Sequence, residues 1–180
     1  SGGTIVVYPS TKSSLVSNEN TIIGNTVLYG ATSGKLFASG QAGERFAVRN
    51  SGSFSVVEGC GAHGCEYMTG GTAIILGEVG DNFGAGMTGG MAFVYDNKNT
   101  FENFANPTSI VWQEVETDHW KKFLKESLNI FVKETNSKVA GKILNDFDDE
   151  LKKFKQICPI EMLDKLDNPI SLRSHTKKAG

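Results

Sequence analysis

The sequence predicts an all-β fold: a right-handed parallel β-helix, built as a single-stranded solenoid, with an α-helical appendage after it. Three observations indicate this architecture: an uneven distribution of glycine, short β-like segments at constant spacing, and a helical pattern of apolar residues toward the C-terminal end. The 180-residue chain has 21 glycines, and only Gly141 and Gly180 lie beyond Gly90. The glycine-rich part is therefore compositionally distinct from the rest.

The repeat is clearest in the tetrapeptide "MTGG", which occurs at 68–71 and again, 19 residues later, at 87–90. A strand-like pentamer follows each copy, "TAIIL" and then "MAFVY", and similar pentamers follow Gly34 and Gly52. A second series, with "NTVLY" and "ERFAV", begins after Gly24 and Gly43 and continues near Gly61 and Gly80. Each coil of about 18–19 residues is thus expected to hold two β segments.

Stacked coils explain this spacing, because short strands can bury a face only against neighbouring strands about 4.8 Å away. The glycines are expected at coil corners with positive φ, where a Cβ costs roughly 1–2 kcal/mol per residue. The usual handedness of β crossovers predicts the right-handed sense. An antiparallel sandwich of short strands is the alternative, but the duplication of "MTGG" favours the solenoid.

The composition divides the chain into three regions: a Gly-rich β-helix domain over 1–96, a linker over 97–116, and a helical segment over 117–180 that ends in the basic tail "SLRSHTKK". Asn, Thr, Ser and Pro dominate the middle region, as is usual for linkers. The helices are expected either to cap an open end of the solenoid or to fold back along its side.

Three helices are predicted in the last region. The first begins at Thr117 or Asp118, the second is capped by Ser137 and extends through Phe154 until Pro159 stops it, and a short third covers 161–166. The apolar stripe of the first comprises Trp120, Phe123, Leu124, Leu128 and Phe131, and that of the second comprises Val139, Ala140, Ile143, Leu144, Phe147, Leu151 and Phe154. Such stripes indicate contacts within the molecule.

Composition also excludes several classes of partner. The formal net charge is −2, which gives no basis for binding nucleic acid. No apolar run approaches the roughly 18 residues of a membrane helix, so no membrane partner is expected. Three cysteines cannot all pair, which favours a reducing compartment and predicts a cytoplasmic location. The strand-like start "TIVVY" leads us to expect that the natural chain extends upstream.

The stretch "FSVVEGCGAHGCEYMTGG" at 54–71 contains the G-x-G-x-x-G spacing of dinucleotide-binding proteins, at Gly59, Gly61 and Gly64. That motif needs a helix after it, and only "CEYM" separates it from the next glycine-bounded strand. Another match, in "GAGMTG" at 84–89, fails in the same way. The phosphate-loop resemblance of "GATSGKL" at 30–36 is one residue short and lacks the required Ser or Thr.

The same stretch holds Cys60, His63 and Cys65, which are ligand types for zinc. A fourth ligand is missing, since Glu66 is poorly placed, and a Cys–His nucleophile would lack a recognisable oxyanion site. We therefore expect these side chains to pack in the solenoid. No catalytic, cofactor-binding or metal-binding residue is predicted.

Acidic and basic side chains offer weaker candidates. The acids of the glycine-rich region are Glu19, Glu44, Glu58, Glu66, Glu78, Asp81 and Asp96, of which Glu58 and Glu78 lie about one coil apart and could stack. Arg45, Arg49 and Asn50 form the densest polar stretch. They are interpreted as an internal ladder of hydrogen bonds and ion pairs with Glu44, with a docking surface as the alternative.

Two long segments carry a resemblance to a known family: "IIGNTVLYGATSGKLFASGQAGERFAVRNSG" and "VVEGCGAHGCEYMTGGTAIILGEVGDNFGAGMTGGMAFVYD". They closely resemble the C-terminal, Gly-rich β-helix domain of the glutamate synthase large (alpha) subunit, and "KETNSKVAGKILNDF" at 133–147 is similar to the helix that follows it. The family usually has Asp at the position of Ala62 and a small apolar residue at that of Cys60. The second difference weakens the metal interpretation further.

The resemblance implies a parent enzyme that makes two glutamates from glutamine, 2-oxoglutarate and a reductant. Its glutaminase site, FMN and iron–sulfur cluster belong to other domains, so this segment is expected to be a non-catalytic scaffold that packs against the amidotransferase and FMN-binding domains. The small electron-delivering subunit is a further expected partner. The alternatives are a free-standing β-helix that binds or processes a small polar or carbohydrate ligand, and a component similar to the Gly-rich solenoid protein of formylmethanofuran dehydrogenase.

Overall fold

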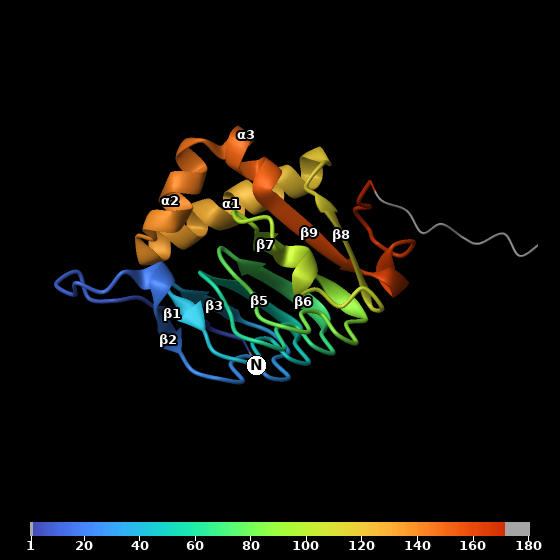
Figure 1. Ribbon diagram of the computed structural model, residues 1–180, viewed down its shortest axis with the longest axis horizontal. Helices are drawn as coiled ribbons and strands as arrows, with labels where there is room; N and C mark the ends of the chain where they lie inside the picture. Colours follow the sequence, from blue (N-terminus) through green and yellow to red (C-terminus); the bar gives the residue numbers. More distant parts are fainter. Residues whose placement is uncertain (1, 172–180) are drawn as a thin grey trace, which may run out of the picture.

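The computed structural model describes residues 2–171, which form a solenoid of parallel strands with a helical lobe against one side (Figure 1). The strands are β1 (Thr4–Val7), β2 (Thr21–Ile23), β3 (Lys35–Ala38), β4 (Gln41–Ala42), β5 (Ser51–Val57), β6 (Thr69–Ile75), β7 (Gly89–Tyr95), β8 (Ile110–Glu114) and β9 (Phe154–Pro159). The helices are α1 (Asp118–Thr135), α2 (Lys138–Asn145) and α3 (Phe147–Glu150), and the 3-10 helices are η1 (Ser17–Glu19), η2 (Phe101–Asn103), η3 (Leu151–Lys153) and η4 (Ile160–Met162).

The main sheet has the order β1-β3-β5-β6-β7-β9-β8, and its first five strands are parallel. Parallel strands stacked at one period confirm the predicted β-solenoid and exclude the antiparallel sandwich. Within the part of the chain that the structure describes, no helix is long and apolar enough to cross a membrane.

Side chains on the stacked strands alternate between two cores, because successive residues of a strand point to opposite faces. The inward ladder comprises Val7, Ala38, Val57, Ile75 and Val94, and the outward ladder comprises Phe37, Val56, Ile74 and Phe93. The inward ladder belongs to the core enclosed by the coils. The outward ladder belongs to a second core, which the helices cover.

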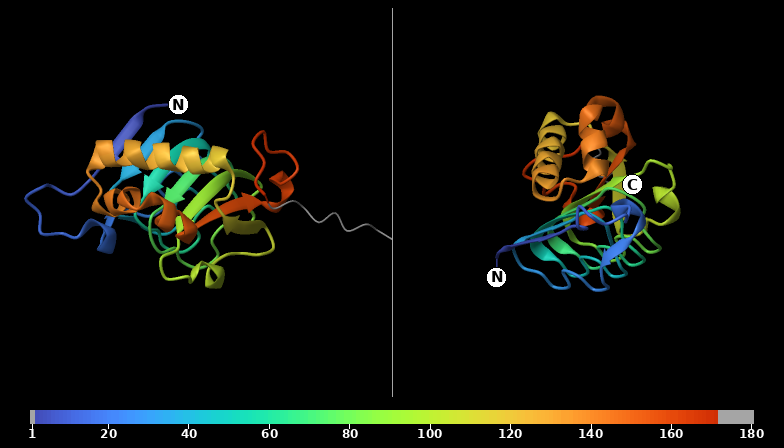
Figure 2. Two further views of the ribbon diagram at one scale, coloured as in Figure 1. Left: turned by 90° about the horizontal axis from the view of Figure 1, so that it is seen from above. Right: turned by 90° about the vertical axis from the view of Figure 1, so that its left-hand side faces the viewer.

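Helix α1 lies across the strands on the outer face of the sheet (Figure 2). Its 18 residues span about 27 Å, enough to cross five strands spaced about 4.8 Å apart. Leu124, Leu128 and Phe131 of α1 are fully buried against the outward ladder, as the predicted stripe requires. Of the two predicted placements, the helices therefore adopt the one along the solenoid's side.

Each coil also has a stretch of turns before it returns to the main sheet, here called the second wall. This wall differs from the prediction, because "NTVLY" and "ERFAV" form turns and not β segments. In these turns every second residue is left-handed, for example Thr26, Leu28 and Gly30 with φ of 60°, 64° and 62°. Their N–H groups pair with adjacent coils, as Arg45 N donates to Ala62 O at 2.8 Å and Ala47 N to Val27 O at 2.9 Å. The stacking of coils thus fixes a backbone that local propensity does not favour.

The glycines have two roles, of which the sequence predicted one. Gly71 and Gly90 have φ of +80°, as expected for corners. Gly43 and Gly80 are not left-handed, yet a Cβ would lie 2.1 Å from Asn25 Oδ1 and 2.3 Å from Ala62 N, respectively. These glycines are needed because adjacent coils approach closely.

The helical segment contains a strand where helix was predicted. Ser137 does cap α2, accepting a hydrogen bond from Ala140 N at 3.1 Å, but α2 ends at Asn145. The continuous helix expected through Phe154 is wrong: residues 147–153 form the separate short helices α3 and η3, and Phe154–Pro159 form the strand β9. This strand pairs antiparallel with both β7 and β8. The pairing satisfies N–H and C=O groups of β7 that would be unpaired at the end of the sheet if β9 were a helix.

Three further expectations concern the linker, the short third helix and the basic tail. The residues expected to form a linker contain η2 and β8. The short helix expected over 161–166 is only the 3-10 turn η4, displaced toward Pro159. Ser171 of the expected basic tail is described, and the rest of that tail lies outside the described residues. The division into three regions stays a prediction.

Replacing Gly71 with Ala is expected to lower the free energy of unfolding by about 2–4 kcal/mol. The new Cβ would lie 2.4 Å from Ser53 O at a left-handed position. Gly141→Ala is the matched control, since nothing lies within 4 Å of its Cβ position and alanine favours the α2 helix. Urea unfolding should show loss of stability for the first variant and no loss for the second. Equal stability would remove the steric role of Gly71, and valine at Gly71 or Gly90 should act like alanine.

Candidate functional site

The stretch 54–71 runs through β5, one turn of the second wall and the start of β6. No helix follows Gly64, so no helix N-terminus is available for a pyrophosphate, as the sequence indicated. Gly59 and Gly61 instead lie against the previous coil, where their Cβ positions come within 3.0 Å of Gln41 Cγ and Glu44 N, respectively. The glycine motif therefore serves coil stacking.

Cys60 and Cys65 are buried in the core of the solenoid, 8% and 0% exposed. Burial raises the pKa of Cys60 to about 12 and that of Cys65 well above its ordinary value, so both remain thiols at neutral pH. His63 Nδ1 lies 2.7 Å from Glu66 Oε1 at the partly exposed surface. This pairing gives neither cysteine a base, and within residues 2–171 no group of three or more His, Cys, Asp or Glu could hold a metal ion.

The polar stretch at 44–50 does not form the expected ion-pair ladder. Arg45 and Arg49 are exposed, and in the described part of the chain no salt bridge joins either of them to Glu44. Asn50 is fully buried, but its side chain bonds to Ser53 and not to Glu44. Its Oδ1 accepts from Ser53 N and Ser53 Oγ, both at 2.9 Å, and its Nδ2 donates to Ser53 O at 3.1 Å.

Glu58 occupies a different environment from Glu78, although both were candidates for a stacked acidic pair. Glu58 is 1% exposed, and its Oε1 accepts from Ser39 Oγ at 2.9 Å and Ser137 Oγ at 2.6 Å. Glu78 is exposed and pairs with Lys98. Because Ser137 caps α2, Glu58 links the solenoid directly to the N-terminus of α2.

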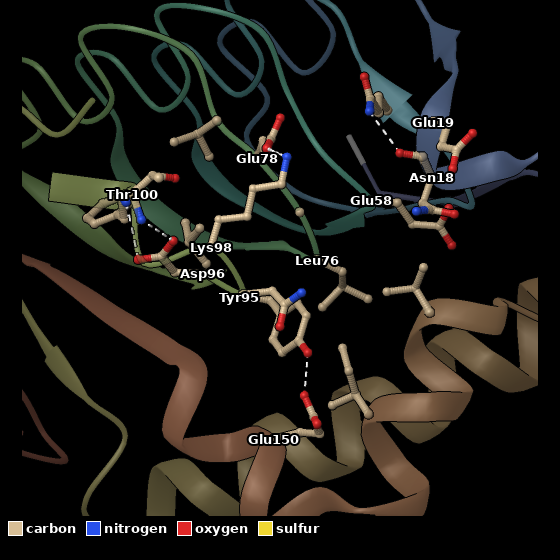
Figure 3. Close-up of a pocket in the computed structure, with 18 of the residues that line it drawn as sticks. Asn18, Glu19, Glu58, Leu76, Glu78, Tyr95, Asp96, Lys98, Thr100 and Glu150 are labelled. Atoms are coloured by element: carbon tan, nitrogen blue, oxygen red, sulfur yellow. Dashed lines mark hydrogen bonds and ion pairs between the residues drawn. The ribbon is translucent and has the colours of Figure 1, made fainter. Parts of the chain in front are cut away.

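A cavity of about 680 Å³ lies beside Glu58, between the solenoid and the helical lobe (Figure 3). The segment that follows β6 and the segment that follows β7 form its solenoid side, and α2 and α3 contribute the facing side. Glu19, Glu58, Glu78, Asp96 and Glu150 all line it, so it gathers acidic side chains from both parts of the molecule. Asp96 is already used, since it accepts from Thr100 N and Phe101 N at 2.8 and 3.2 Å.

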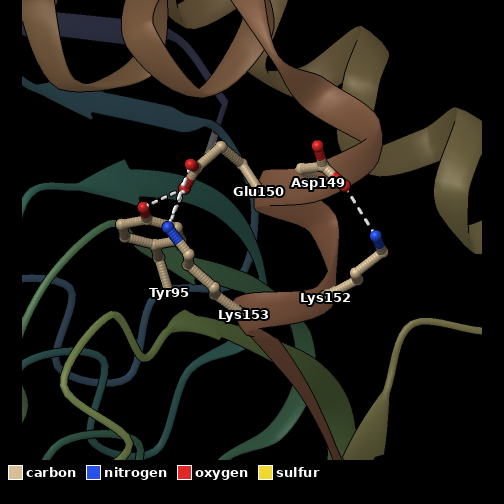
Figure 4. A network of polar contacts seen from close by, with 5 residues as sticks. All are labelled: Tyr95, Asp149, Glu150, Lys152 and Lys153. Atoms are coloured by element: carbon tan, nitrogen blue, oxygen red, sulfur yellow. Dashed lines mark hydrogen bonds and ion pairs between the residues drawn. The ribbon is translucent and has the colours of Figure 1, made fainter.

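At the base of the cavity a polar network joins β7 to the helical lobe (Figure 4). The Tyr95 hydroxyl donates to Glu150, and Lys153 Nζ donates to both Glu150 oxygens at 2.9 Å. Burial, followed by the bond to Glu150, raises the pKa of Tyr95 above its ordinary value. The bonds from Tyr95 and then Lys153 hold the pKa of Glu150 below its ordinary value.

Sequence reasoning placed Glu58 among the acids but missed its partners and the cavity. Ser137 lies 79 residues away along the chain, so no local spacing could reveal the contact. One signal was available: a single glutamate follows the apolar run "FSVV", at the end of a strand expected to be buried. A carboxylate in that position needs partners.

Ser137→Ala is expected to lower the free energy of unfolding by about 2 kcal/mol, because it removes both the α2 cap and one donor to buried Glu58. Thr117→Ala is the matched control: Thr117 precedes α1, but its hydroxyl is buried without a partner. The control should change stability by less than about 0.5 kcal/mol. Chemical denaturation measures both, and equal effects would mean that neither the α2 cap nor the bond to Glu58 stabilises the fold.

Tyr95→Phe is expected to lower stability by about 1 kcal/mol at neutral pH, because Glu150 loses a hydrogen bond to its charged form. A depressed folded pKa gives stability that is complete above the ordinary value of 4.5 and is lost as pH falls through the folded pKa. The difference between wild type and variant should therefore shrink in acid. Unfolding at neutral pH and near pH 3 tests this, with exposed Tyr29→Phe as control. A pH-independent difference would contradict the assignment.

Comparison with known proteins gives a consistent result. The model of the GXGXG motif family matches residues 1–160. The chain is 61% identical over 172 residues to the NADPH glutamate synthase large chain of Azospirillum brasilense, covering 96% of this chain and 11% of that protein.

The names of two other relatives specify different reductants. The ferredoxin-dependent glutamate synthase of Antithamnion sp. is 48% identical over 88% of this chain and 10% of its own length. The NADH glutamate synthase of Schizosaccharomyces pombe is 45% identical over 99% of this chain and 8% of its own length. The chain thus spans about a tenth of the length of these relatives. It belongs to the GXGXG motif family and is a domain of the kind found in glutamate synthase large chains.

Proposed function

We propose that this chain is a non-catalytic structural domain of a glutamate synthase, and that it holds other domains of the same large chain in position. The parent enzyme would form glutamate from glutamine and 2-oxoglutarate in the cytoplasm, with FMN and an iron–sulfur cluster in other domains. The small electron-delivering subunit is a further partner under this proposal. Support comes from the site chemistry: the cysteines are buried as thiols, and Glu58 bonds to two serines.

The relatives add a second line of support. Their names specify NADPH, ferredoxin and NADH, yet each is 45–61% identical to this chain. A segment that remains similar while the named reductant changes is better suited to a structural role than to selecting the reductant.

The observation that carries the packing role is the contrast between the two ends of the solenoid. At one end β9 covers β7, whereas at the other β1 pairs only with β3 among the described strands. Ile5 and Leu36 share one register position of the inward face, but Ile5 is 60% exposed and Leu36 only 2%. Further exposed apolar side chains, Tyr8, Leu15, Val16 and Tyr29, belong to the same N-terminal part of the chain. We propose that another part of the large chain covers this end.

Ile5→Lys tests the packing role in the complete large chain. The variant should lower the melting temperature and the rate of glutamate formation, since a buried charge would be unpaired. The matched control is Ile160→Lys, because Ile160 is 41% exposed and follows β9, at the opposite end of the sheet from β1. Indistinguishable behaviour of the two variants would contradict packing at this end.

The isolated 180-residue chain tests the non-catalytic role. It should show neither glutaminase activity nor glutamate formation under conditions in which the complete enzyme is active. Activity of the purified chain, lost on replacing Cys60, Cys65 or Glu58, would overturn the proposal.

A further inference from the structure

The second wall carries large exposed side chains at positions where its backbone favours glycine. The wall has one turn in each of four coils, over 25–30, 44–49, 62–67 and 81–86, on the side of the solenoid away from the helical lobe (Figure 1). In every turn the second, fourth and sixth residues are left-handed. Backbone hydrogen bonds between adjacent coils align these residues in three rows.

The middle row packs inside the solenoid, whereas the two outer rows face solvent. Leu28, Ala47 and Cys65 of the middle row belong to the core enclosed by the coils. The residues of the outer rows are exposed or partly exposed. These rows consist of Thr26, Arg45, His63 and Asn82, and of Gly30, Arg49, Tyr67 and Gly86. Packing in the core therefore explains the middle row but not the outer ones.

The first and last coils show which residues the backbone favours in the outer rows. Three of their four outer positions hold glycine or asparagine, which adopt left-handed φ most readily: Gly30, Asn82 and Gly86. The two central coils have larger side chains at all four equivalent positions: Arg45, Arg49, His63 and Tyr67. None of these four is buried. Backbone strain that gains no core packing indicates a role outside the fold itself.

The two arginines and the tyrosine also do little for their own chain. Arg45 and Arg49 are exposed, and in the described part of the chain no salt bridge involves either guanidinium. Tyr67 is 56% exposed, and its ring lies over Gly86, where a Cβ would come within 2.5 Å of the ring atoms Cδ1 and Cε1. Glycine at position 86 thus leaves room for a ring that remains half-exposed.

The shape and the residue types of this surface indicate a polypeptide partner. Small molecules bind in concave sites, and neither the cavity beside Glu58 nor a smaller one beside Glu116 is lined by Arg49 or Tyr67. Arginine and tyrosine are enriched among the residues that dominate protein–protein binding. An unpaired guanidinium is matched by a carboxylate, which it can bind through two hydrogen bonds.

The acidic side chains of the wall lie outside the row of Arg49 and Tyr67. Glu44 and Asp81 share the first position of the turn, and Glu66 is paired with His63. The row of Arg49 and Tyr67 therefore presents an unpaired positive charge beside an aromatic ring, which suits a partner that has both a carboxylate and an apolar side chain.

We propose that Arg49 and Tyr67 form the centre of a docking surface for another segment of the same large chain, which presents a carboxylate to Arg49 and an apolar side chain to Tyr67. This inference rests on the proposed function, because it takes the partner from the large chain. The chain spans 11% of the length of its Azospirillum brasilense relative, so most of such a large chain lies outside it. The surface is distinct from the solenoid end around Ile5, since it belongs to the two central coils.

Hydroxyl-radical footprinting of the complete large chain and of the isolated 180-residue chain tests this surface. Tyr67 should be oxidised at least about fivefold more slowly in the complete chain, because the partner excludes water from the centre of the interface. Ile160 is the control, since it is 41% exposed and distant in the fold, and it should react alike in both. Equal oxidation of Tyr67 in both would overturn the proposal. Protection that requires the small subunit would overturn the assignment to the large chain.

Ile5 distinguishes this result from the packing proposed for the solenoid end. Protection of Ile5 without protection of Tyr67 would support the scaffold role and contradict the second surface. Protection of Tyr67 without protection of Ile5 would support the second surface and contradict packing at the solenoid end.

Arg49→Gly distinguishes docking from a role in folding. In the isolated chain the melting temperature should stay the same or rise by up to about 4 °C, because glycine relieves the left-handed backbone. In the complete chain the variant should lose much of the protection of Tyr67. Asn82→Gly is the matched control, since it makes the same change at a left-handed position of the last coil and should leave the protection of Tyr67 intact. A lower melting temperature of isolated Arg49→Gly would assign Arg49 to the fold and overturn the proposal.

Two further variants test the charge of the partner. Arg49→Lys keeps the positive charge, whereas Arg49→Glu reverses it and should expose Tyr67 in the complete chain more than lysine does. Equal protection of Tyr67 in these two variants would contradict a carboxylate on the partner.

Discussion

The close approach of successive coils is the constraint on which the rest of this structure depends. Backbone groups of the second wall pair forward and backward with adjacent coils, and these pairs hold every second residue in a left-handed conformation. Nine of these positions carry a side chain other than glycine, each at a cost of roughly 1–2 kcal/mol. They are Thr26, Leu28, Arg45, Ala47, Arg49, His63, Cys65, Tyr67 and Asn82. The conformation is stable only because neighbouring coils impose it together.

The same stacking creates the surface on which the helices pack. Parallel register places Phe37, Val56, Ile74 and Phe93 in one outward row, and such a row would be an exposed apolar face without α1. The helical lobe is then fixed at its edge by polar contacts, through Ser137 with Glu58 and Glu150 with Tyr95. The cavity lies between these two attachments, where the lobe and the solenoid do not meet.

The sequence was informative where a pattern repeated and uninformative where a contact was distant. The 19-residue duplication predicted the parallel solenoid, and the stripe around Leu124 and Leu128 predicted α1 correctly. The sequence could not predict the left-handed turns, because "ERFAV" has the composition of a strand and only the adjacent coils determine its backbone conformation. Phe154 likewise fits the spacing of a helical stripe in the sequence, but in the fold it pairs with β7, a strand distant in the chain.

Prediction of the site was limited in a similar way. Burial of Cys60 and Cys65 and the structural use of the glycines followed from the period. The environment of Glu58 did not, because its partners Ser39 and Ser137 come from a preceding coil and from the helical lobe. The electrostatic environment of a buried side chain such as Glu58 depends on contacts that are distant in sequence. The residues next to it in the chain do not indicate these contacts.

The antiparallel return of β9 has a consequence for synthesis of the chain. The last parallel strand, β7, is complete at Tyr95, but its covering strand does not begin until Phe154. At typical translation rates this interval lasts roughly 3–12 s, during which the hydrogen-bonding edge of β7 has no neighbour. Unpaired edges readily recruit other strands. The ribosome-bound intermediate is therefore the stage at which this fold is most vulnerable to pairing with the wrong chain.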